Sequence, residues 1–427
     1  MNEKFKSVAI LGGGPAACTL GIMLTRGGVR VAMYHLPKRA PLIVGESLVP
    51  AIIPMLRTLG VEDAVKSYSK LKPGATINMS ADTNFSFQFN NIRGELPKYA
   101  YNVPRDQFDD TLLAAARKAG VKIIEAAASV EKIPGTDKVK LGDDALAAAG
   151  DFFNSGAPAS GAASSTQPDL IVDATGRVRL LPKLLGIGAV EGGRKDTALF
   201  AHVDQTKVDH DGHVHSTRLD HGWSWRIPLP DRMSLGIVIG TEHLPKFGVT
   251  KEDRYDNLLK QDSVLNKFAG DSKRISPVME YTNYQLVSDR MFGENWALVG
   301  DTAGFIDPVF SSGLLIGMQG GMMLAEAVLK GTPKAFAHYQ EKCSHHLKCW
   351  HEIADYFYNG KLFNSVVVGE KMKKQYPLLK LMMPHFENQF ARIFTGAASD
   401  SHFSIGMMRW VINWSAKKES GEGCRIR

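Results

Sequence analysis

The stretch from Gly300 to Gly313 brings together residue types suited to hold a cofactor and a small anion. Asp301 follows an apolar segment that predicts a strand, so its carboxylate is expected at a strand end, where it can accept a hydrogen bond from a cofactor hydroxyl. Ser311-Ser312-Gly313 precedes an apolar pattern, Leu314 to Leu329, that predicts a helix. Backbone amides at a helix start bind anions. The stretch therefore predicts a cofactor contact beside a site for an anion such as a halide.

A glycine-rich turn near the N-terminus predicts a dinucleotide site. An apolar strand over 7–11 runs into this turn, followed by a helix to about Gly27 and a second strand from Val29 to Tyr34. An acidic residue usually follows that second strand to bind the ribose. Here His35 stands there, so it either replaces the acid or lies at the surface. The turn supplies the expected cofactor-binding residues Gly12, Gly14, Pro15, Ala16 and Ala17.

Composition indicates a soluble globular enzyme. The chain has 427 residues, 44% of them hydrophobic and 22% charged, which suits two connected domains. The net charge of +7 comes with no nucleic-acid motif, so we expect no nucleic-acid partner, whereas a basic surface could receive an acidic carrier protein. The four cysteines are scattered, which favours a reducing cytoplasm over a disulfide framework. We expect no stable membrane insertion, because no apolar run reaches about 20 residues.

Two further segments have unusual compositions, one suggestive of a metal site and one rich in small residues. Cysteines and histidines crowd between Cys343 and His351, but they match no zinc spacing, so no metal site is expected. Residues 142–167 are rich in alanine, glycine and serine, which predicts a flexible surface insertion.

Patterns along the rest of the chain predict the elements that would position these groups. An amphipathic helix starts at Arg105, and a strand over 169–173 ends in Asp173-Ala174-Thr175-Gly176. Short alternating runs over 196–240 are typical of antiparallel strands. Beyond residue 330 the pattern is helical.

Together, Gly12-x-Gly14-x-x-Ala17, the Arg105 helix, Asp173-Ala174-Thr175-Gly176 and Gly300-Asp301 resemble the FAD-binding framework of the class A flavoprotein monooxygenases. The resemblance covers most of residues 5–330 and implies FAD contacts from Arg105, Asp173, Gly300 and Asp301. It implies an α/β fold with a Rossmann-like FAD-binding domain. The expected parts are that discontinuous domain over 1–80, 100–180 and 285–335, an antiparallel-sheet substrate domain over 81–99 and 181–284, and a helical C-terminal region over 336–427.

Three further motifs resemble the flavin-dependent halogenases. They are Gly45-Glu46-Ser47-Leu48-Val49-Pro50, Trp223-Ser224-Trp225-Arg226-Ile227-Pro228 and Phe305-x-x-Pro308-x-x-Ser311-x-Gly313. The resemblance implies flavin contacts from Glu46, Ser47, Pro308 and Gly313, and a halide held by the amides of Ser312 and Gly313. It also implies a barrier between flavin and substrate, lined by Trp223, Trp225, Phe305 and Ser311.

The same resemblance implies a catalytic lysine some 25 positions after the first motif. Lys72 stands there, followed by Pro73 and Gly74, and Lys70 is the competing candidate. The lysine would either donate a hydrogen bond that polarises hypohalous acid or form a chloramine. The second role needs a neutral amine, which burial favours. The sequence leaves both roles open.

The residue before the Ser-x-Gly turn bears on the substrate. The tryptophan-acting branch has a glutamate there, and this chain has Phe310. We therefore expect a phenol or a pyrrole, either free or tethered to a carrier protein, rather than free tryptophan. The implied reaction uses reduced FAD, oxygen and chloride or bromide to make hypohalous acid. A single dinucleotide fingerprint implies that a separate flavin reductase reduces the FAD.

Two other functions fit the flavin-binding motifs. One is a single-component aromatic hydroxylase or an isoprenoid reductase, which would ignore halide. The other is a flavin-binding accessory protein without catalysis, which would bind FAD but form no product. Turnover that depends on halide separates the halogenase from both.

Overall fold

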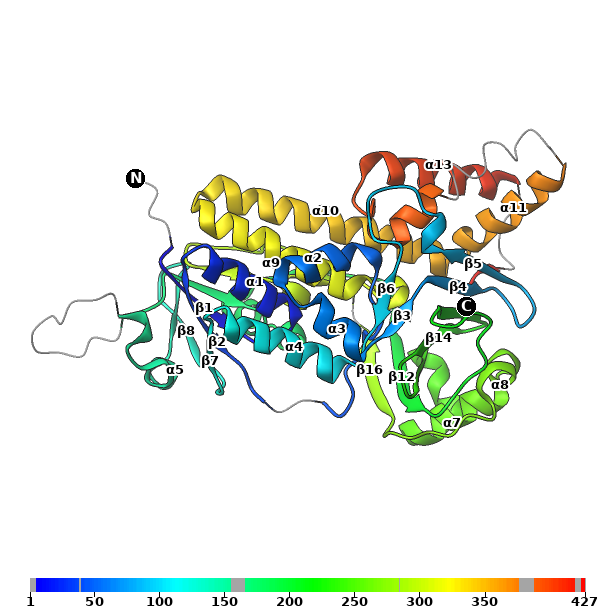
Figure 1. Cartoon of the computed structure of the whole chain (residues 1–427), viewed down its shortest axis with the longest axis horizontal. Coiled ribbons are helices and arrows are strands. Elements are labelled where there is room, and N and C mark those ends of the chain that lie inside the picture. Colours follow the sequence, from blue (N-terminus) through cyan, green and yellow to red (C-terminus); the bar gives the residue numbers. More distant parts are fainter. Residues whose placement is uncertain are drawn as a thin grey trace, which may run out of the picture.

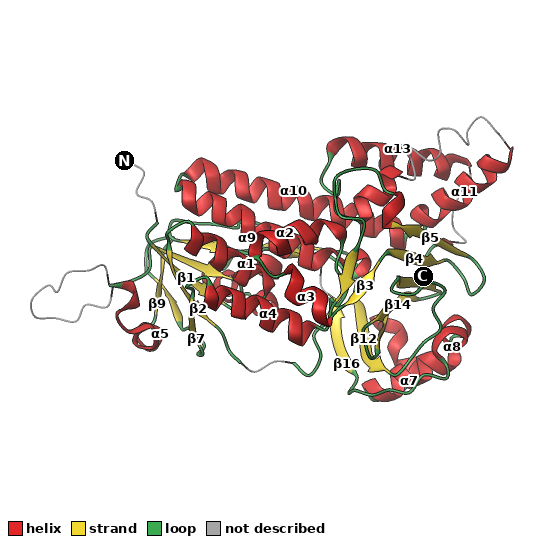
Figure 2. Ribbon diagram, viewed as in Figure 1, coloured by secondary structure: helices red, strands yellow, loops and turns green. Residues whose placement is uncertain are grey.

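The computed structural model describes residues 5–37, 40–154, 166–283, 285–375, 388–418 and 424–426. The molecule is elongated, with a parallel sheet towards one end and a larger sheet towards the other (Figure 1). The long helices α9 (Ser312–Lys330) and α10 (Pro333–Tyr358) run side by side across the parallel-sheet half. Figure 2 shows that most helices gather on this side, while the larger sheet has its own pair of helices below it. This arrangement confirms the predicted fold class.

The first sheet has five parallel strands in the order β18-β10-β1-β2-β7. Strand β1 is buried along its whole length, as expected where helices cover both faces of a parallel sheet. Helix α1 lies between α4 and α9. The bounds are β1 Ser7–Leu11, α1 Pro15–Arg26, β2 Arg30–Tyr34, α2 Ile53–Leu59, α3 Glu62–Tyr68, α4 Arg105–Lys118, β7 Lys122–Ile124, β10 Leu170–Asp173, α6 Leu180–Leu185 and β18 Trp296–Leu298.

The second sheet has seven strands in the order β16-β12-β15-β14-β13-β4-β5, antiparallel except for the β13–β4 pair. Its two faces differ because side chains alternate along each strand. On β12, Leu199 and Ala201 pack with Tyr255 of α7, whereas Phe200 faces the parallel-sheet half. The bounds are β4 Gly74–Asn78, β5 Asn84–Gln88, β12 Asp196–Val203, β13 Val214–Leu219, β14 Gly222–Pro228, β15 Met233–Gly240, α7 Lys251–Gln261, α8 Ser263–Ala269 and β16 Met279–Asn283.

Short ladders join the two halves. Strand β3 pairs with β6, and β4 begins only two residues after β3 ends at Lys72. Strand β4, which falls before the domain boundary predicted at residue 80, belongs to the seven-stranded sheet. The remaining strands are β3 Lys70–Lys72, β6 Ala100–Asn102, β8 Val130–Lys132, β9 Val139–Leu141, β11 Ala189–Glu191, β17 Leu286–Ser288 and β19 Gly304–Phe305.

The first half of the segment expected to be a flexible surface insertion, 142–167, is helical. Helix α5 (Asp143–Ala149) and a short 3-10 helix (Gly150–Phe153) form there, and Leu146 and Phe153 are buried in the core. The alanines that suggested a loop are good helix formers, and apolar side chains between them anchor the helix. Residues 155–165 lie outside the described residues.

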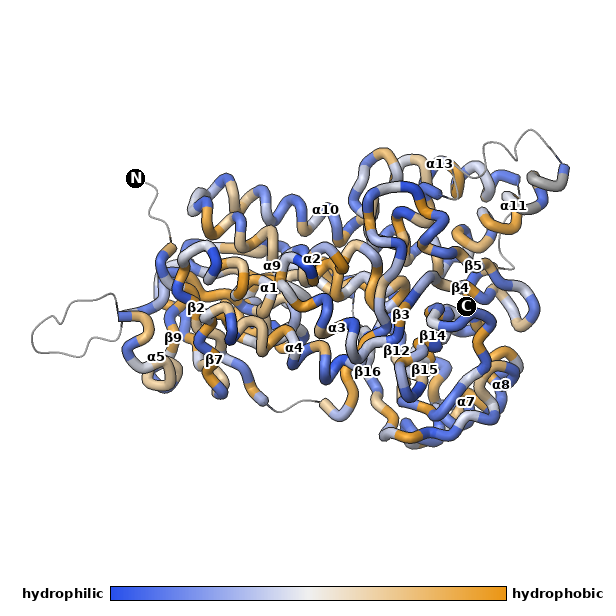
Figure 3. The backbone as a smooth tube through the Cα atoms, viewed as in Figure 1, coloured by the Kyte–Doolittle hydropathy of each residue, from blue (hydrophilic) through white to orange (hydrophobic). Residues whose placement is uncertain are grey.

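The C-terminal region is helical where the structure describes it. It contains α10, α11 (Lys361–Gln375), a helical segment over 388–394 and α13 (His402–Lys418). Hydrophilic and hydrophobic residues alternate along α10, as in a helix with one face on the core (Figure 3). The rest of the predicted helical region, residues 376–387, 419–423 and 427, lies outside the described residues.

Helix α9 is the most apolar helix near the site. The segment Val309–Lys330 has a mean hydropathy of 1.3 and is long and apolar enough to cross a membrane, but half of its apolar window is buried inside the protein. It packs closely on α1, because Gly321 has no side chain: a Cβ there would lie 2.7 Å from the Ala16 carbonyl oxygen. This packing places the start of α9 beside the glycine turn.

Candidate active site

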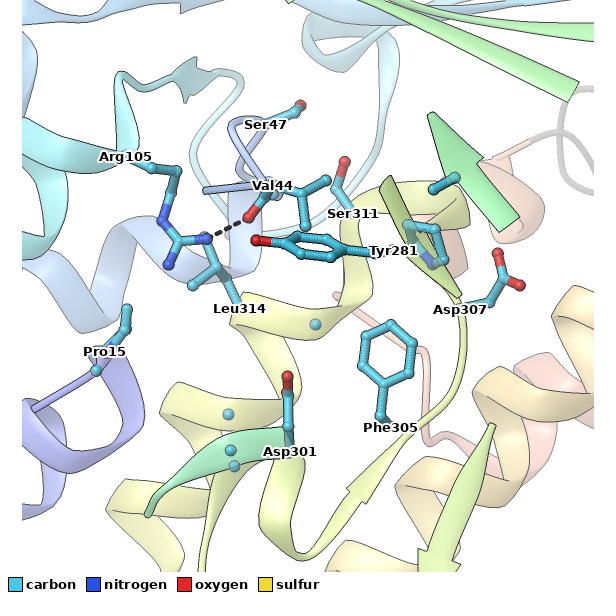
Figure 4. Close-up of a pocket in the computed structure, with 18 of the residues that line it drawn as sticks. Pro15, Val44, Ser47, Arg105, Tyr281, Asp301, Phe305, Asp307, Ser311 and Leu314 are labelled. Carbon is cyan, nitrogen blue, oxygen red and sulfur yellow. Dashed lines mark hydrogen bonds between the residues drawn. The ribbon is translucent and has the colours of Figure 1, made fainter. Parts of the chain in front are cut away.

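A cavity of about 260 Å³ lies between the parallel-sheet half and the inner face of the seven-stranded sheet. The glycine turn contributes Gly14, Pro15, Ala16 and Ala17 to its wall, and the second half contributes Trp223 and Trp225. Figure 4 shows residues from several elements converging on this space. The other predicted residues that line it are Ser47, Arg105, Gly300, Asp301, Phe305, Pro308, Ser311 and Gly313.

The glycine turn fits the pyrophosphate of FAD. Helix α1 starts at Pro15 without a side-chain cap, so its first amides are available to an anion. A Cβ at Gly14 would meet nothing within 4 Å, so the backbone there is open to a ligand. The His35 ring, at the end of β2, occupies the space that a Cβ at Gly13 would take. His35 thus packs on the turn, outside the cavity lining, and its contact with the ribose stays a prediction.

Arg105 and Asp301 face each other across the cavity in Figure 4. Arg105 is held by Asp109, with its Nε 2.9 Å from Oδ1, and it donates a 2.6 Å hydrogen bond to the Val44 carbonyl. Burial raises the pKa of the Asp301 carboxyl, and the positive charges of Arg177 and Arg105 partly oppose that rise. Asp301 is therefore a half-buried acceptor after the strand end, where the sequence places it.

Arg177 and Tyr281 are among the cavity residues that the sequence analysis did not single out. The Arg177 guanidinium lies 4.2 Å from the centroid of the Tyr281 ring. Figure 4 shows this ring reaching into the middle of the cavity, with its hydroxyl on the side of Arg105 and Val44. Arg177 directly follows the predicted cofactor-side motif that ends at Gly176, and this position could have singled it out as a cation beside the cofactor. Tyr281 carries no such signal, because its strand precedes no recognised motif.

The structure places Glu46 and Asp173 outside the cavity lining, and their flavin contacts stay predictions. The Glu46 carboxylate lies 2.7 Å from His202 Nε2. The Asp173 carboxylate accepts hydrogen bonds from the amides of Thr175 and Leu181, 2.9 and 2.7 Å away. Both acids therefore brace the turns beside the cavity, because leaving those buried partners would be costly.

The start of α9 has the geometry of an anion site. Phe310 and Ser311 both adopt left-handed backbone conformations, with φ of 65° and 59°, and no side chain caps the helix. A space of about 10 Å³, enough for about one water-sized particle, lies beside Ser312 and Gly313. Strained backbone persists where the surroundings enforce it, often at functional sites. The amides of Ser312 and Gly313 thus fit the predicted halide.

The two tryptophans of β14 lie on the same face of the sheet, since one residue separates them. The Trp225 ring occupies the space above Gly236 on β15, where a Cβ would overlap it. Its Nε1 donates to Ser234 Oγ at 3.2 Å, and the Trp223 Nε1 donates to the Tyr358 hydroxyl at 2.9 Å. Both rings are buried and held by polar anchors while they line the cavity.

Lys72 is buried, whereas the competing Lys70 forms a surface ion pair with Asp211. The Lys72 Nζ donates to Ser47 Oγ and to the Leu48 carbonyl, both at 2.8 Å. Its ammonium position lies 5.6 Å from the centroid of the Phe89 ring. Burial without a carboxylate partner lowers the pKa of Lys72 to about 7. Of the two candidates, only Lys72 has the buried setting that a reactive amine needs.

Within the described ranges, no group of three or more histidine, cysteine, aspartate or glutamate side chains could hold a metal ion.

Comparison with known proteins identifies the family. The FAD binding domain family matches residues 6–142, and the Tryptophan halogenase family matches residues 75–362. The chain belongs to the tryptophan halogenase family. It is 25% identical over 410 residues to the 1H-pyrrole-2-carbonyl-[peptidyl-carrier protein] chlorinase of Pseudomonas fluorescens, covering 87% of both chains. It is 26% identical over 329 residues to the tryptophan 2-halogenase of Chondromyces crocatus, covering 75% of this chain and 60% of that one.

Solved structures of halogenases share the fold. The flavin-dependent brominase Bmp2 superposes with a TM-score of 0.76 at 22% identity, over 97% of this chain and 100% of that one. The halogenase PltM, solved with phloroglucinol and FAD, gives 0.70 at 17% identity, over 97% and 92% of the two chains. The predictions of a flavin-dependent halogenase, of FAD as cofactor and of a halide as co-substrate are confirmed. A hydroxylase or an isoprenoid reductase is not favoured.

Proposed function

We propose that this halogenase acts on an electron-rich ring, a phenol or a pyrrole, that is presented by a carrier protein, and that Lys72 delivers the halogen. The observation that carries the proposal is the position of Lys72. Its hydrogen-bond partner Ser47 lines the flavin cavity, while its aromatic neighbour Phe89 lines a different cavity. An amine in that place can take an oxidised halogen from one side and present it on the other.

FAD reduced by a separate flavin reductase would supply part of the electrons that reduce oxygen, and chloride or bromide would supply the rest, so that one oxygen atom ends in hypohalous acid and the other in water. The chain supplies the positions. Ser312 and Gly313 hold the halide at the start of α9, and Arg105 and Asp301 hold the cofactor. The buried rings of Trp223 and Trp225 exclude the substrate and bulk water, because they fill the wall between the two halves.

The hydrogen bonds of Lys72 bear on its two possible roles. Donation to Ser47 and Leu48 uses two N–H bonds. A neutral amine then keeps its lone pair for attack on the halogen. The N–halogen bond forms as the halogen–oxygen bond breaks, and the released hydroxide takes one proton from the nitrogen to become water. An ammonium group would instead keep one proton with which to polarise hypohalous acid. A pKa of about 7 makes both forms accessible near neutral pH.

The substrate class follows from what surrounds Phe310. Its ring lies 4.6 Å from the centroid of Phe394 and 5.3 Å from that of Phe357. This aromatic cluster offers no carboxylate at the position where the tryptophan-acting branch has one. A ring that needs no help with deprotonation, a phenol or a pyrrole, suits it. The pyrrole substrate in the name of the Pseudomonas fluorescens relative supports the same class and the carrier protein.

The test is an assay with FAD, a flavin reductase, NADH, oxygen and either chloride or bromide. The substrates are pyrrole-2-carboxylate and 4-hydroxybenzoate as thioesters on a purified peptidyl carrier protein, the free acids, and free tryptophan. Mass spectrometry should show replacement of ring hydrogen by halogen on a carrier-bound ring and none on tryptophan. Halogenated tryptophan, or an oxygenated product that forms equally well without halide, would overturn the proposal.

A further inference from the structure

A second cavity, of about 310 Å³, lies on the far side of Lys72 from the flavin cavity. Its wall includes Phe89, whose ring lies 5.6 Å from Lys72 Nζ, and Pro50, two residues after the carbonyl that accepts from Lys72. The remaining lining residues are Ile92, Arg93, Gly94, Glu95, Leu96, Pro97, Lys98, Arg392, Thr395 and Ala397. We name this space the distal cavity.

Three chain segments build the distal cavity and are fastened to one another. The loop over 89–98 is joined to the segment over 388–397 by the Arg93 amide, which donates to Asn388 Oδ1 at 2.7 Å. The Ala51 amide donates to the Thr395 carbonyl at 3.1 Å. Within the loop, Lys98 Nζ donates to the carbonyls of Ile92 and Gly94. The cavity therefore has a defined wall.

The charges on this wall favour an anion. Arg93, Lys98 and Arg392 are basic, and Glu95 is the one acidic residue among the lining residues. Lys98 is occupied with the loop carbonyls. The Arg392 Nε is shielded from solvent and has no hydrogen-bond partner, and neither arginine forms an ion pair within the part of the chain that the structure describes. A buried guanidinium nitrogen without a partner is costly, so an anionic ligand would stabilise it.

We infer that the distal cavity binds the phosphate of a phosphopantetheine arm, with Arg392 and Arg93 as its phosphate ligands. This rests on the proposed function, in which a carrier protein presents the aromatic ring. A carrier protein holds its acyl group by a thioester at the end of such an arm, and a phosphodiester joins the arm to the protein. Two arginines match a phosphate group well, because the planar guanidinium donates two parallel hydrogen bonds. The apolar end of the cavity, at Phe89 and Pro50, leads towards Lys72.

The first test measures binding without catalysis. The full-length protein, loaded with FAD, is titrated by calorimetry with 4′-phosphopantetheine and with pantetheine, which lacks the phosphate. We expect the phosphorylated compound to bind at least about tenfold more tightly, and this advantage to be lost in Arg392→Ala and reduced in Arg93→Ala. Arg117→Ala is the matched control, because Arg117 is an exposed arginine paired with Glu125 on another surface. Equal binding of both compounds to the wild-type protein would overturn the inference.

The second test uses turnover. Pyrrole-2-carboxylate is supplied as a thioester of phosphopantetheine and of pantetheine, and the ratio of their kcat/KM values is measured. We expect Arg392→Ala to lower this ratio about tenfold through KM. Arg93 is exposed, so Arg93→Ala should fold even if loss of Arg392 perturbs the cavity. A calorimetric preference for the phosphorylated compound, without halogenation of any thioester, would uphold the phosphate site and refute the proposed function. An unchanged kcat/KM ratio in both variants would refute the site.

Discussion

Trp223 and Asp307 share one hydroxyl group, that of Tyr358. The Trp223 Nε1 donates to it at 2.9 Å, and it donates in turn to Asp307 Oδ2 at 3.0 Å. The other Asp307 oxygen accepts from the Val309 amide, inside the turn that leads to the halide site. One buried chain of hydrogen bonds therefore ties the tryptophan strand to the start of α9, so the position of the barrier and that of the halide are coupled.

Removal of that hydroxyl should disturb both ends. In Tyr358→Phe, a buried indole N–H and a buried carboxylate oxygen each lose a partner, so we expect a loss of about 1 to 3 kcal/mol in the free energy of unfolding. We also expect a several-fold rise in KM for halide. Tyr356→Phe is the control, because Tyr356 lies on the same helix and bonds Glu352 away from the site. Urea denaturation and halide titration give the readouts, and a Tyr358→Phe enzyme that matches this control would refute the coupling.

Lys72→Ala should abolish halogenation while FAD binding remains. The side chain lies outside the cavity lining and reaches the cavity through Ser47, so its loss leaves the cofactor contacts in place. We expect a fall in halogenation of at least about 100-fold, with NADH oxidation continuing. Lys70→Ala is the matched control, because Lys70 forms an exposed ion pair. Flavin absorbance and product analysis by mass spectrometry decide the matter, and a variant that halogenates at the wild-type rate would remove Lys72 from the mechanism.

Burial of Lys72 also predicts how stability depends on pH. Its pKa falls from 10.5 in the unfolded chain to about 7 in the folded protein. Between these values the unfolded chain binds more protons, so this residue makes the free energy of unfolding rise with pH. Lys72→Met lacks that contribution. We therefore expect its stability relative to wild type to be greatest near pH 7 and to decline towards pH 10, as measured by urea denaturation; a constant difference would show that the amine is not desolvated.

Gly313→Ala should weaken halide binding without unfolding the protein. A Cβ at Gly313 would meet no atom within 4 Å, yet the residue lies beside the proposed halide position. We expect KM for bromide to rise about tenfold, since a methyl group there would crowd the anion. Gly406→Ala is the control, because it also adds a methyl group to open space on a helix, α13. Thermal stability should be retained in both variants, and an unchanged KM in Gly313→Ala would argue against this halide site.

Much of the fold could be predicted because its elements carry local signals. Three elements have local sequence patterns that predict their structure, and all three formed as expected: the glycine turn after β1, the Arg105 helix and α9. Local patterns do not indicate which strand or helix an element packs against. The pairing of β4 with β13 is a long-range contact that no local pattern indicates. The position of Tyr281 likewise depends on the pairing of its strand in the seven-stranded sheet, which brings its ring against Arg177.

Glu46 and Asp173 also show that sequence motifs do not reveal which groups a side chain contacts. Motif spacing brought Glu46 and Asp173 near the cofactor, and the structure places both in the adjoining turns. The motif spacing could not show that His202 contacts the Glu46 carboxylate, or that the amides of Thr175 and Leu181 donate to the Asp173 carboxylate. Strand alternation could not choose between Lys70 and Lys72 either, because residues two apart on β3 point to the same side; the choice depends on the segments that bury Lys72.

The loop over 89–98 lines the distal cavity and contributes no residue to the flavin cavity. In the proposed arrangement, this loop, which would receive the carrier-bound arm, is therefore separate in sequence from the residues that line the flavin cavity. Substitutions in this loop can alter which molecules are accepted while oxygen activation proceeds as before, so it is the natural place to diversify in a directed-evolution library.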